Sequence, residues 1–295
     1  MKEFVLVTGA TGNQGGAVAR ALLAAGEPVH ALTRAPQSPR ALALAEAGVV
    51  IVEGDLDDPS SLEKALDGAR GVFSVQTPVM TDLTGDAEVR HARHLAAVAD
   101  AAGVEQIVHT SVSGVGRGPV DEARWGSFTG HYWRTKAEAE QRMRDAGARR
   151  WTILRPALFF DNFVRPSFYF PDPARPAHLV LALGLDVVQA WVALSDIGAA
   201  AAAAFADPAY FDRVELELAG DLRTIRQVNA AVSQALGVET TVPASPQEAR
   251  HDGIPEDLAL YQDYVTEHPY PARPETARAL GLPTTTLEQW VTATF

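Results

Sequence analysis

The stretch VTGATGNQGG, residues 7–16, decides the fold, because it joins a short apolar strand to a helix through spaced glycines. Small residues at this spacing let the chain turn sharply, and backbone N–H groups can then approach a pyrophosphate at the helix N-terminus. A strand precedes the loop and a helix follows it, which favours a dinucleotide site over a tight turn that binds nothing. The residues that we expect around the phosphates are Gly9, Thr11, Gly12, Asn13, Gln14 and Gly15.

Strand and helix signals alternate through the first half of the chain, and the strands are nearly continuous apolar runs. Such alternation indicates βαβ units, and apolar runs indicate strands covered on both faces. We therefore expect an α/β fold: a Rossmann-type doubly wound parallel sheet with a smaller C-terminal α/β substrate domain. The expected strands are 4–8, 29–33, 49–55, 71–76, 106–112 and 151–156, and the expected helices are 13–26, 42–48, 60–66, 86–103 and 132–147.

The alternation of strand and helix signals stops after Pro156, and residues 159–176 are rich in aromatic residues and proline. This segment predicts a loop or lid beside a pocket. A helix at 193–208 with Asp196 as its N-cap, a strand at 214–220 and a helix at 224–237 follow. The predicted domains are a dinucleotide-binding Rossmann domain, 1-156 with a returning segment near 186-206, and a substrate-binding domain, 157-185 and 207-295.

Charge and composition restrict the class of partner. The 295 residues carry a net charge of −12 and contain no cysteine. A nucleic-acid partner is not expected, because phosphate backbones require a basic face. Disulfides and thiolate metal sites are excluded. No uninterrupted apolar run is long enough to span a membrane, and the N-terminus resembles a first strand rather than a signal peptide, so we expect a cytoplasmic protein.

The end of the second predicted strand selects the cofactor. An NAD site places a carboxylate there, whereas this chain has Thr33 and Arg34, with Arg40 one short loop later. A guanidinium can bind a 2′-phosphate in bidentate fashion, so we expect NADP(H); the alternative is that both arginines are only solvated. Ligands lie at the carboxyl ends of parallel strands. On that rule the further predicted cofactor contacts are Asp55, Leu56, Gln76, Thr77 and Pro156. Lys136, on a predicted helix, could also donate to the nicotinamide ribose and hold the cofactor.

Four segments resemble the NmrA-like family, an atypical branch of the short-chain dehydrogenase/reductases. They are VTGATGNQGG, TRAPQSPRALALAEAGVVIVEGDLDD, RPALFFDNF, and SDIGAAAAAAFADP followed by ELAGD; the closing TTTLEQWV is similar as well. The resemblance implies a Rossmann domain that binds NADP(H) and a smaller C-terminal domain over the nicotinamide end. Some relatives reduce quinones, aromatic ethers or related compounds, and others bind NADP(H) as redox sensors without the catalytic tyrosine.

The stretch HYWRTK, residues 131–136, places Tyr132 and Lys136 one helical turn apart. The pair matches the Tyr-x-x-x-Lys motif that follows the fifth strand in active short-chain dehydrogenases. A free phenol has a pKa of about 10, and a nearby ammonium lowers it, so Tyr132 is the expected acid and Lys136 its activator. The alternative is a helix face with a half-buried tyrosine and an exposed lysine.

The third catalytic position departs from the family pattern. HTSVSG offers Thr110, Ser111 and Ser113, but the usual hydroxyl position falls on Val112. Because neighbours along a strand point to opposite faces, a substitute requires a different turn of the loop. We favour Ser111, with a local turn hydrogen bond as the alternative role.

Aromatic residues near the pair predict an apolar slot for a flat, aromatic or quinone-like substrate. The expected lining residues are Trp125, Trp133, Phe159, Phe160, Asn162 and Phe163. His91 and His94 lie three apart on a helix but have no third ligand at a familiar spacing, so no metal is expected.

Together these features predict an NADPH-dependent oxidoreductase that transfers hydride to a small apolar carbonyl, quinone or conjugated acceptor. The alternative is a non-catalytic NADP(H)-binding redox sensor that acts through a protein partner. We expect a monomer or homodimer.

Overall fold

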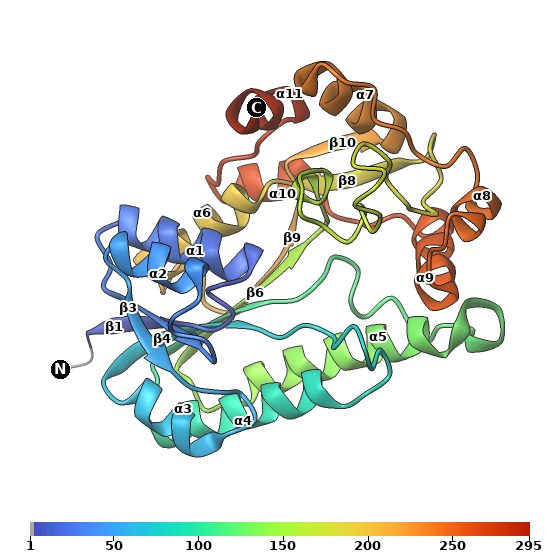
Figure 1. The fold of residues 1–295 in the computed structure, drawn as a ribbon. Helices are drawn as coiled ribbons and strands as arrows, with labels where there is room; N and C mark the ends of the chain where they lie inside the picture. Colours follow the sequence, from blue (N-terminus) through green and yellow to red (C-terminus); the bar gives the residue numbers. More distant parts are fainter. Residues whose placement is uncertain (1–2) are drawn as a thin grey trace. The chain divides into compact units, whose positions relative to one another are not determined.

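The computed structural model describes residues 3–295, which form two compact units (Figure 1). Unit 1 comprises the chain up to Val115 together with Arg134–Arg155 and Leu194–Leu216. Unit 2 comprises Gly116–Trp133, Pro156–Ala193 and Glu217–Phe295. Residues 116–133 therefore belong to unit 2, whereas the sequence analysis grouped them with the Rossmann domain; the functional division into two domains stays a prediction.

Unit 1 is built on a seven-stranded sheet of order β3-β2-β1-β4-β5-β6-β9. Strand β1 pairs with β2 and β4, β2 with β3, β4 with β5, and β5 with β6, all in parallel, so these six strands form a parallel sheet whose order reverses beside β1. This confirms the predicted Rossmann-type fold. The strands are β1 (Phe4–Val7), β2 (Val29–Thr33), β3 (Val50–Glu53), β4 (Ala69–Val75), β5 (Gln106–Thr110), β6 (Arg150–Pro156) and β9 (Val214–Leu218).

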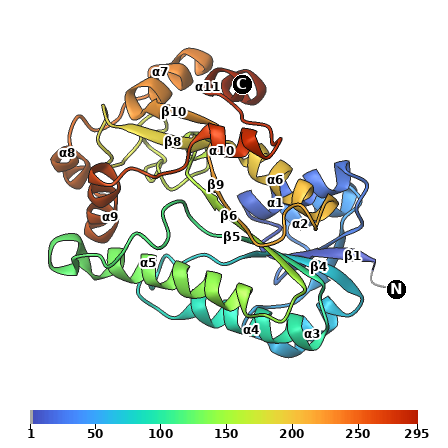
Figure 2. The ribbon, with the colours of Figure 1, turned by 180° about the vertical axis from the view of Figure 1, so that it is seen from behind.

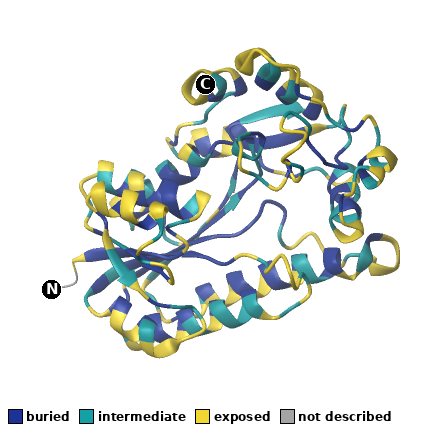
Figure 3. Ribbon diagram, in the orientation of Figure 1, coloured by how far each residue is buried: buried dark blue, intermediate teal, exposed yellow. Residues whose placement is uncertain are grey.

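Helices cover both faces of this sheet (Figures 1 and 2). One face carries α1 (Asn13–Ala24), α2 (Pro39–Glu46) and α6 (Leu194–Ala206), and the other carries α3 (Pro59–Leu66), α4 (Ala87–Ala101) and the C-terminal part of α5 (Glu122–Arg144). The central strands between the two layers are buried, whereas the edge strand β3 is half-buried or exposed, and the outer helix faces are exposed (Figure 3). The alanine-rich α6 packs closely on α1, since a Cβ on Gly198 would lie 2.8 Å from the Ala17 carbonyl oxygen.

Two helix starts differ from the prediction. Helix α5 begins at Glu122, ten residues before the predicted start at 132, and bends at Gly126, whose φ of 79° and ψ of 155° are not helical. Glycine reaches this conformation because it has no Cβ to clash. The segment 122–144 therefore consists of two helices that meet at Gly126. Asp196 is wrong as an N-cap, because α6 begins at Leu194 and Asp196 lies buried in its first turn.

Unit 2 contains a three-stranded sheet of order β10-β8-β7 and several short helices. Its elements are β7 (Leu158–Phe159), the 3-10 turn η1 (Phe160–Phe163), β8 (Val188–Val192), β10 (Asp221–Thr224), α7 (Ile225–Leu236), α8 (Pro246–His251), α9 (Glu256–Glu267), α10 (Pro274–Ala279) and α11 (Leu287–Thr294).

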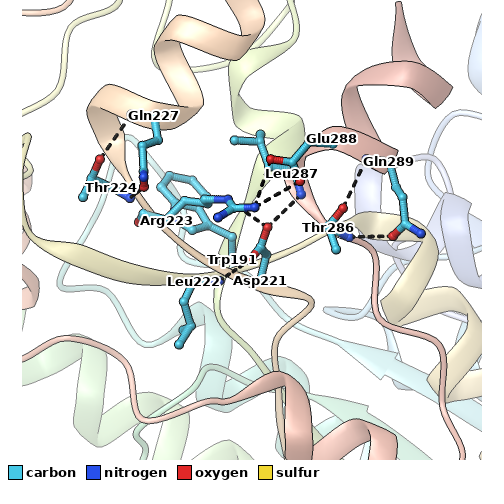
Figure 4. A network of polar contacts seen from close by, with 10 residues as sticks. All are labelled: Trp191, Asp221, Leu222, Arg223, Thr224, Gln227, Thr286, Leu287, Glu288 and Gln289. Atoms are coloured by element: carbon cyan, nitrogen blue, oxygen red, sulfur yellow. Dashed lines mark hydrogen bonds and ion pairs between the residues drawn. The ribbon is translucent and has the colours of Figure 1, made fainter.

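Polar contacts fix α7 and α11 to the small sheet of unit 2 (Figure 4). Thr224 and Gln227 form a capping box at the start of α7. The Asp221 carboxylate accepts a hydrogen bond from the Leu287 N–H at 2.9 Å, and Arg223 pairs with Glu288 at 2.9 Å. These bonds join the first turn of α11 to β10.

Candidate functional site

The glycine loop of unit 1 forms a cradle that only glycine permits. Gly9 has a φ of +59°, and a Cβ on Gly15 would lie 2.3 Å from the Gly9 carbonyl oxygen. Gly12 is the N-cap residue of α1 and supplies no side-chain cap. The first N–H groups of α1 are therefore available to an anion, which the helix dipole also favours. The cradle fits the pyrophosphate of a dinucleotide.

Thr8 anchors this loop to the neighbouring strand. Its hydroxyl accepts a hydrogen bond from the Val75 N–H at 2.9 Å and lies 3.2 Å from the Phe73 carbonyl oxygen. Sequence reasoning missed Thr8, although the first threonine of VTGATG was available as a signal. The buried hydroxyl connects the end of β1 to the end of β4, the two strands between which the sheet order reverses.

A cavity of about 420 Å³ adjoins the loop within unit 1. Its lining residues are Ala10, Thr11, Gly12, Asn13, Gly16, Arg20, Arg40, Ala43, Leu44, Ala47 and Leu194. The predicted contacts Thr11, Gly12, Asn13 and Arg40 therefore share one cavity, and Arg40 donates a hydrogen bond to the Thr11 carbonyl oxygen at 3.0 Å.

The end of β2 presents one buried and one exposed candidate for the cofactor. The Thr33 side chain accepts a hydrogen bond from the Ala35 N–H at 3.2 Å. Arg34 is exposed and forms no hydrogen bond or ion pair with any residue in the range 3–295. Its guanidinium is thus available to a phosphate.

The candidates beyond β3 and β4 differ in exposure. Asp55 is half-buried and accepts a hydrogen bond from the Asp57 N–H at 3.0 Å, and Leu56 beside it is also half-buried. Gln76 is buried and bonded through its side-chain nitrogen to the Ser74 hydroxyl at 3.0 Å, whereas Thr77 is exposed. Gln14 reaches across to β5, where it accepts a hydrogen bond from Thr110 at 2.8 Å.

Lys136 lies in a buried polar cluster of unit 1. Its ammonium forms an ion pair with Glu88 and donates to the Gln76 carbonyl oxygen at 3.1 Å. Thr135 donates to the other Glu88 oxygen at 3.2 Å. The exposed fractions of Glu88 and Lys136 are only 3% and 6%, so the ammonium charge is offset by a carboxylate inside the protein. Sequence reasoning missed Glu88.

Ser111 and Val112 are both buried. The side chains of Thr110 and Ser111 point to opposite faces of the sheet. Thr110 bonds to Gln14 of α1, whereas Ser111 faces Glu140 of α5 on the other side of the sheet. Ser113 is buried too. The structure therefore directs Ser111 toward the helix layer that carries Lys136.

Glu140 and His109 complete this buried layer. Burial alone would raise the pKa of Glu140, but bonds and charge from Arg155, then Ser111 and Arg144, hold the pKa below its usual value. Arg155 binds both carboxylate oxygens, at 2.9 and 2.7 Å. Burial lowers the pKa of His109 to about 3, and its Nδ1 lies 3.1 Å from the Ser74 hydroxyl. His109 is thus neutral near pH 7.

Tyr132 lies four residues before Lys136 on α5, but it belongs to unit 2. Its half-buried ring contacts other aromatic rings of that unit, with centroid distances of 5.6 Å to Trp133 and 5.0 Å to Tyr261. The Tyr261 and Tyr270 hydroxyl oxygens are 2.6 Å apart. Sequence reasoning missed Tyr261 and Tyr270, which lie in the C-terminal tail.

The predicted pocket residues of unit 2 differ in their surroundings. Phe160 and Phe163 are fully buried, and Phe160 stacks on Trp191 and Trp290 at 5.5 and 5.3 Å. Phe159 and Asn162 are half-buried. Trp125 lines a cavity of about 520 Å³ with Arg117, Pro119, Val120, Asp121, Tyr264, His268 and Pro269. The buried Trp133 indole N–H has no hydrogen-bond partner within residues 3–295.

Asp55, Asp57 and His91 bring potential metal-ligand atoms within 4.8 Å of one another. Asp57 is already bound by Arg90 at 2.7 Å, and that hydrogen bond holds its pKa below the usual range. His94 instead lies 2.8 Å from the Leu56 carbonyl oxygen. A guanidinium on Asp57 competes with a cation, so we infer no metal from this group.

Within residues 3–295, no helix is both long enough and apolar enough to cross a membrane.

The sequence model of the NmrA-like family matches residues 1–282. The chain belongs to the NmrA-like family. This confirms the resemblance that the sequence motifs indicated.

Three relatives are informative. A (4-alkanoyl-5-oxo-2,5-dihydrofuran-3-yl)methyl phosphate reductase of Streptomyces griseus subsp. griseus is 33% identical over 79% of this chain and 74% of its own length. An NAD(P)H azoreductase of Xenophilus azovorans is 30% identical over 87% of this chain and 84% of its own length. The NADPH complex of the Escherichia coli quinone oxidoreductase QOR2 has a TM-score of 0.74 and 24% identity, and it covers 98% of this chain and 99% of that one. At 24% identity, the similarity to the QOR2 structure supports the fold of this chain alone.

Proposed function

We propose that this NmrA-like protein is an NADP(H)-dependent oxidoreductase that reduces a small, largely apolar acceptor. The observation that carries the proposal is the glycine cradle, in which a Cβ on Gly15 would lie 2.3 Å from the Gly9 carbonyl oxygen. Such close backbone approach serves a pyrophosphate. The two reductase relatives, one named for NAD(P)H, support the same chemistry.

In the proposed binding mode, the residues of the glycine loop hold the phosphates at the start of α1. Arg34, exposed and without a protein partner in the range 3–295, binds the 2′-phosphate that distinguishes NADP(H), and Arg40 adds a second guanidinium. The remaining proposed contacts are Thr33, Asp55, Leu56, Gln76, Thr77, Lys136 and Pro156.

The catalytic proposal assigns the proton to Tyr132. When bound, NADPH supplies a hydride, and the acceptor oxygen then gains negative charge. Tyr132 is the proposed general acid, which gives its phenolic proton to that oxygen. Lys136, held by Glu88 and the Gln76 carbonyl, is the proposed activator of Tyr132 and also holds the cofactor; the Glu88 carboxylate offsets part of its charge. Ser111 is the proposed hydroxyl that orients the acceptor.

The proposed acceptors are quinones, conjugated carbonyls and related flat compounds. Aromatic side chains of unit 2, with Trp125, Trp133 and Phe159 foremost, are the proposed walls of the acceptor site. Phe160, Asn162 and Phe163 support these walls in this proposal, since the two phenylalanines are fully buried.

The test follows NADPH oxidation by the purified protein with a panel of quinones, azo dyes, aldehydes and enones. Turnover on at least one class, with NADPH favoured over NADH, supports the proposal. Tight NADP(H) binding with no turnover on the panel, and a protein partner whose affinity changes with the cofactor's redox state, would instead favour the sensor alternative.

A further inference from the structure

Three tyrosine side chains of unit 2 contact one another in succession, Tyr132 with Tyr261 and Tyr261 with Tyr270. Tyr132 comes from α5, Tyr261 from α9, and Tyr270 from the segment after α9. The Tyr132 and Tyr261 rings meet edge to face with centroids 5.0 Å apart, and the Tyr261 and Tyr270 oxygens are 2.6 Å apart. The second distance is that of a short O–H···O bond. The proposed acid therefore packs against the first of two hydrogen-bonded phenols.

We propose that Tyr261, supported by Tyr270, is a positioning residue that donates a hydrogen bond to the Tyr132 oxygen and stabilises its phenolate. This inference rests on the proposed function, in which Tyr132 gives a proton to the acceptor and becomes a phenolate. The phenolate regains that proton from solvent after the reduced product has formed.

The buried ion pair of unit 1 gives a reason for such a donor. Lys136, one turn further along α5, is bound to Glu88 at exposed fractions of 6% and 3%. An ammonium that is paired with a carboxylate stabilises a nearby phenolate less than an unpaired ammonium does. A neutral hydroxyl donor adds stabilisation without another charge, and hydrogen bonds to charged groups are among the strong ones.

Tyr261 and Tyr270 are suited to remain donors. Burial raises the pKa of Tyr261 well above the usual value, and a hydrogen bond with Tyr132 contributes in the same direction. Burial also raises the pKa of Tyr270. Among the described residues, Tyr169 also raises the pKa of both phenols, and the Arg117 charge acts on Tyr270 and lowers its pKa. Both phenols thus keep their protons when Tyr132 loses its own.

The experiment measures the Tyr132 phenol pKa in the cofactor-free protein, by NMR titration of tyrosines labelled with ¹³C at Cζ. The chain has only 6 tyrosines, so single Tyr→Phe variants assign the signals. Tyr261→Phe should raise the Tyr132 pKa by about one unit or more and lower kcat about tenfold to hundredfold. KM and the affinity for NADPH should stay unchanged. Tyr270→Phe should shift both quantities in the same direction by less.

Tyr210→Phe is the control, because Tyr210 is 54% exposed and is not among the proposed site residues. If Tyr261→Phe leaves the Tyr132 pKa and kcat at the values of this control, the inference is wrong. If Tyr132→Phe keeps the wild-type rate, the proposed acid role fails instead. The cofactor-free titration separates these failures, since it reports the hydrogen bond without any turnover.

Discussion

The Glu88–Lys136 ion pair gives a prediction that does not depend on the substrate. Glu88→Gln keeps the shape of the side chain but removes the charge that faces the buried ammonium. Breaking a buried pair at one partner costs about 3–5 kcal/mol, because the other charge is left uncompensated. At about 2–4 °C per kcal/mol, the melting temperature should fall by roughly 6–20 °C. Thermal unfolding followed by circular dichroism measures this change.

Glu138→Gln, on the helix α5 that carries Lys136, provides the control. Glu138 pairs with Arg142, but the two side chains are each 47% exposed, so its loss should cost about 0–1 kcal/mol. The double variant Glu88→Leu/Lys136→Met should recover much of the stability lost in Glu88→Gln, since apolar side chains can replace a buried pair. Equal melting temperatures for Glu88→Gln and Glu138→Gln would refute the reasoning.

Three further predictions concern unit 1. Gly15→Ala should abolish NADPH binding measured by calorimetry, because its Cβ would lie 2.3 Å from the Gly9 carbonyl oxygen; unchanged affinity would exclude the cradle. Arg34→Glu should weaken NADPH far more than NADH, and equal loss of both would remove the reason for NADP(H). His109 accepts a proton near pH 6.5 when unfolded and at about 3 when folded, so wild-type stability should fall as pH drops below 6.5. The contribution is up to about 1.4 kcal/mol per pH unit, and His109→Gln should lack it in urea melts between about pH 7 and 5; identical slopes would contradict it.

The parallel sheet could be predicted because its determinants are local. Residues 29–33 were predicted as a strand with the bounds that β2 has, and the glycine loop fixed the first turn. The start of α5 could not be predicted, because Gly126 interrupts the helical pattern while the chain continues as helix on both sides. The spacing of apolar residues in the sequence does not by itself distinguish a kink within a helix from the end of that helix.

The site was only partly predictable, because burial of a charge depends on tertiary packing. Lys136 was singled out by its spacing from Tyr132, but Glu88 lies 48 positions earlier on an amphipathic helix where a carboxylate predicts exposure. Tyr261 and Tyr270 gave no local signal either, since their contact joins α9 to the segment that follows it. Sequence motifs thus indicated the residues of local turns and not their partners from distant elements.

The most direct test of the central claim compares wild type with Tyr132→Phe on the best acceptor, at saturating NADPH. The variant keeps the ring and loses only the hydroxyl, so NADPH affinity should not change. Loss of a general acid predicts a fall in kcat of about 10²–10⁴-fold. A Tyr132→Phe protein that binds NADPH normally and turns over at the wild-type rate would contradict the account.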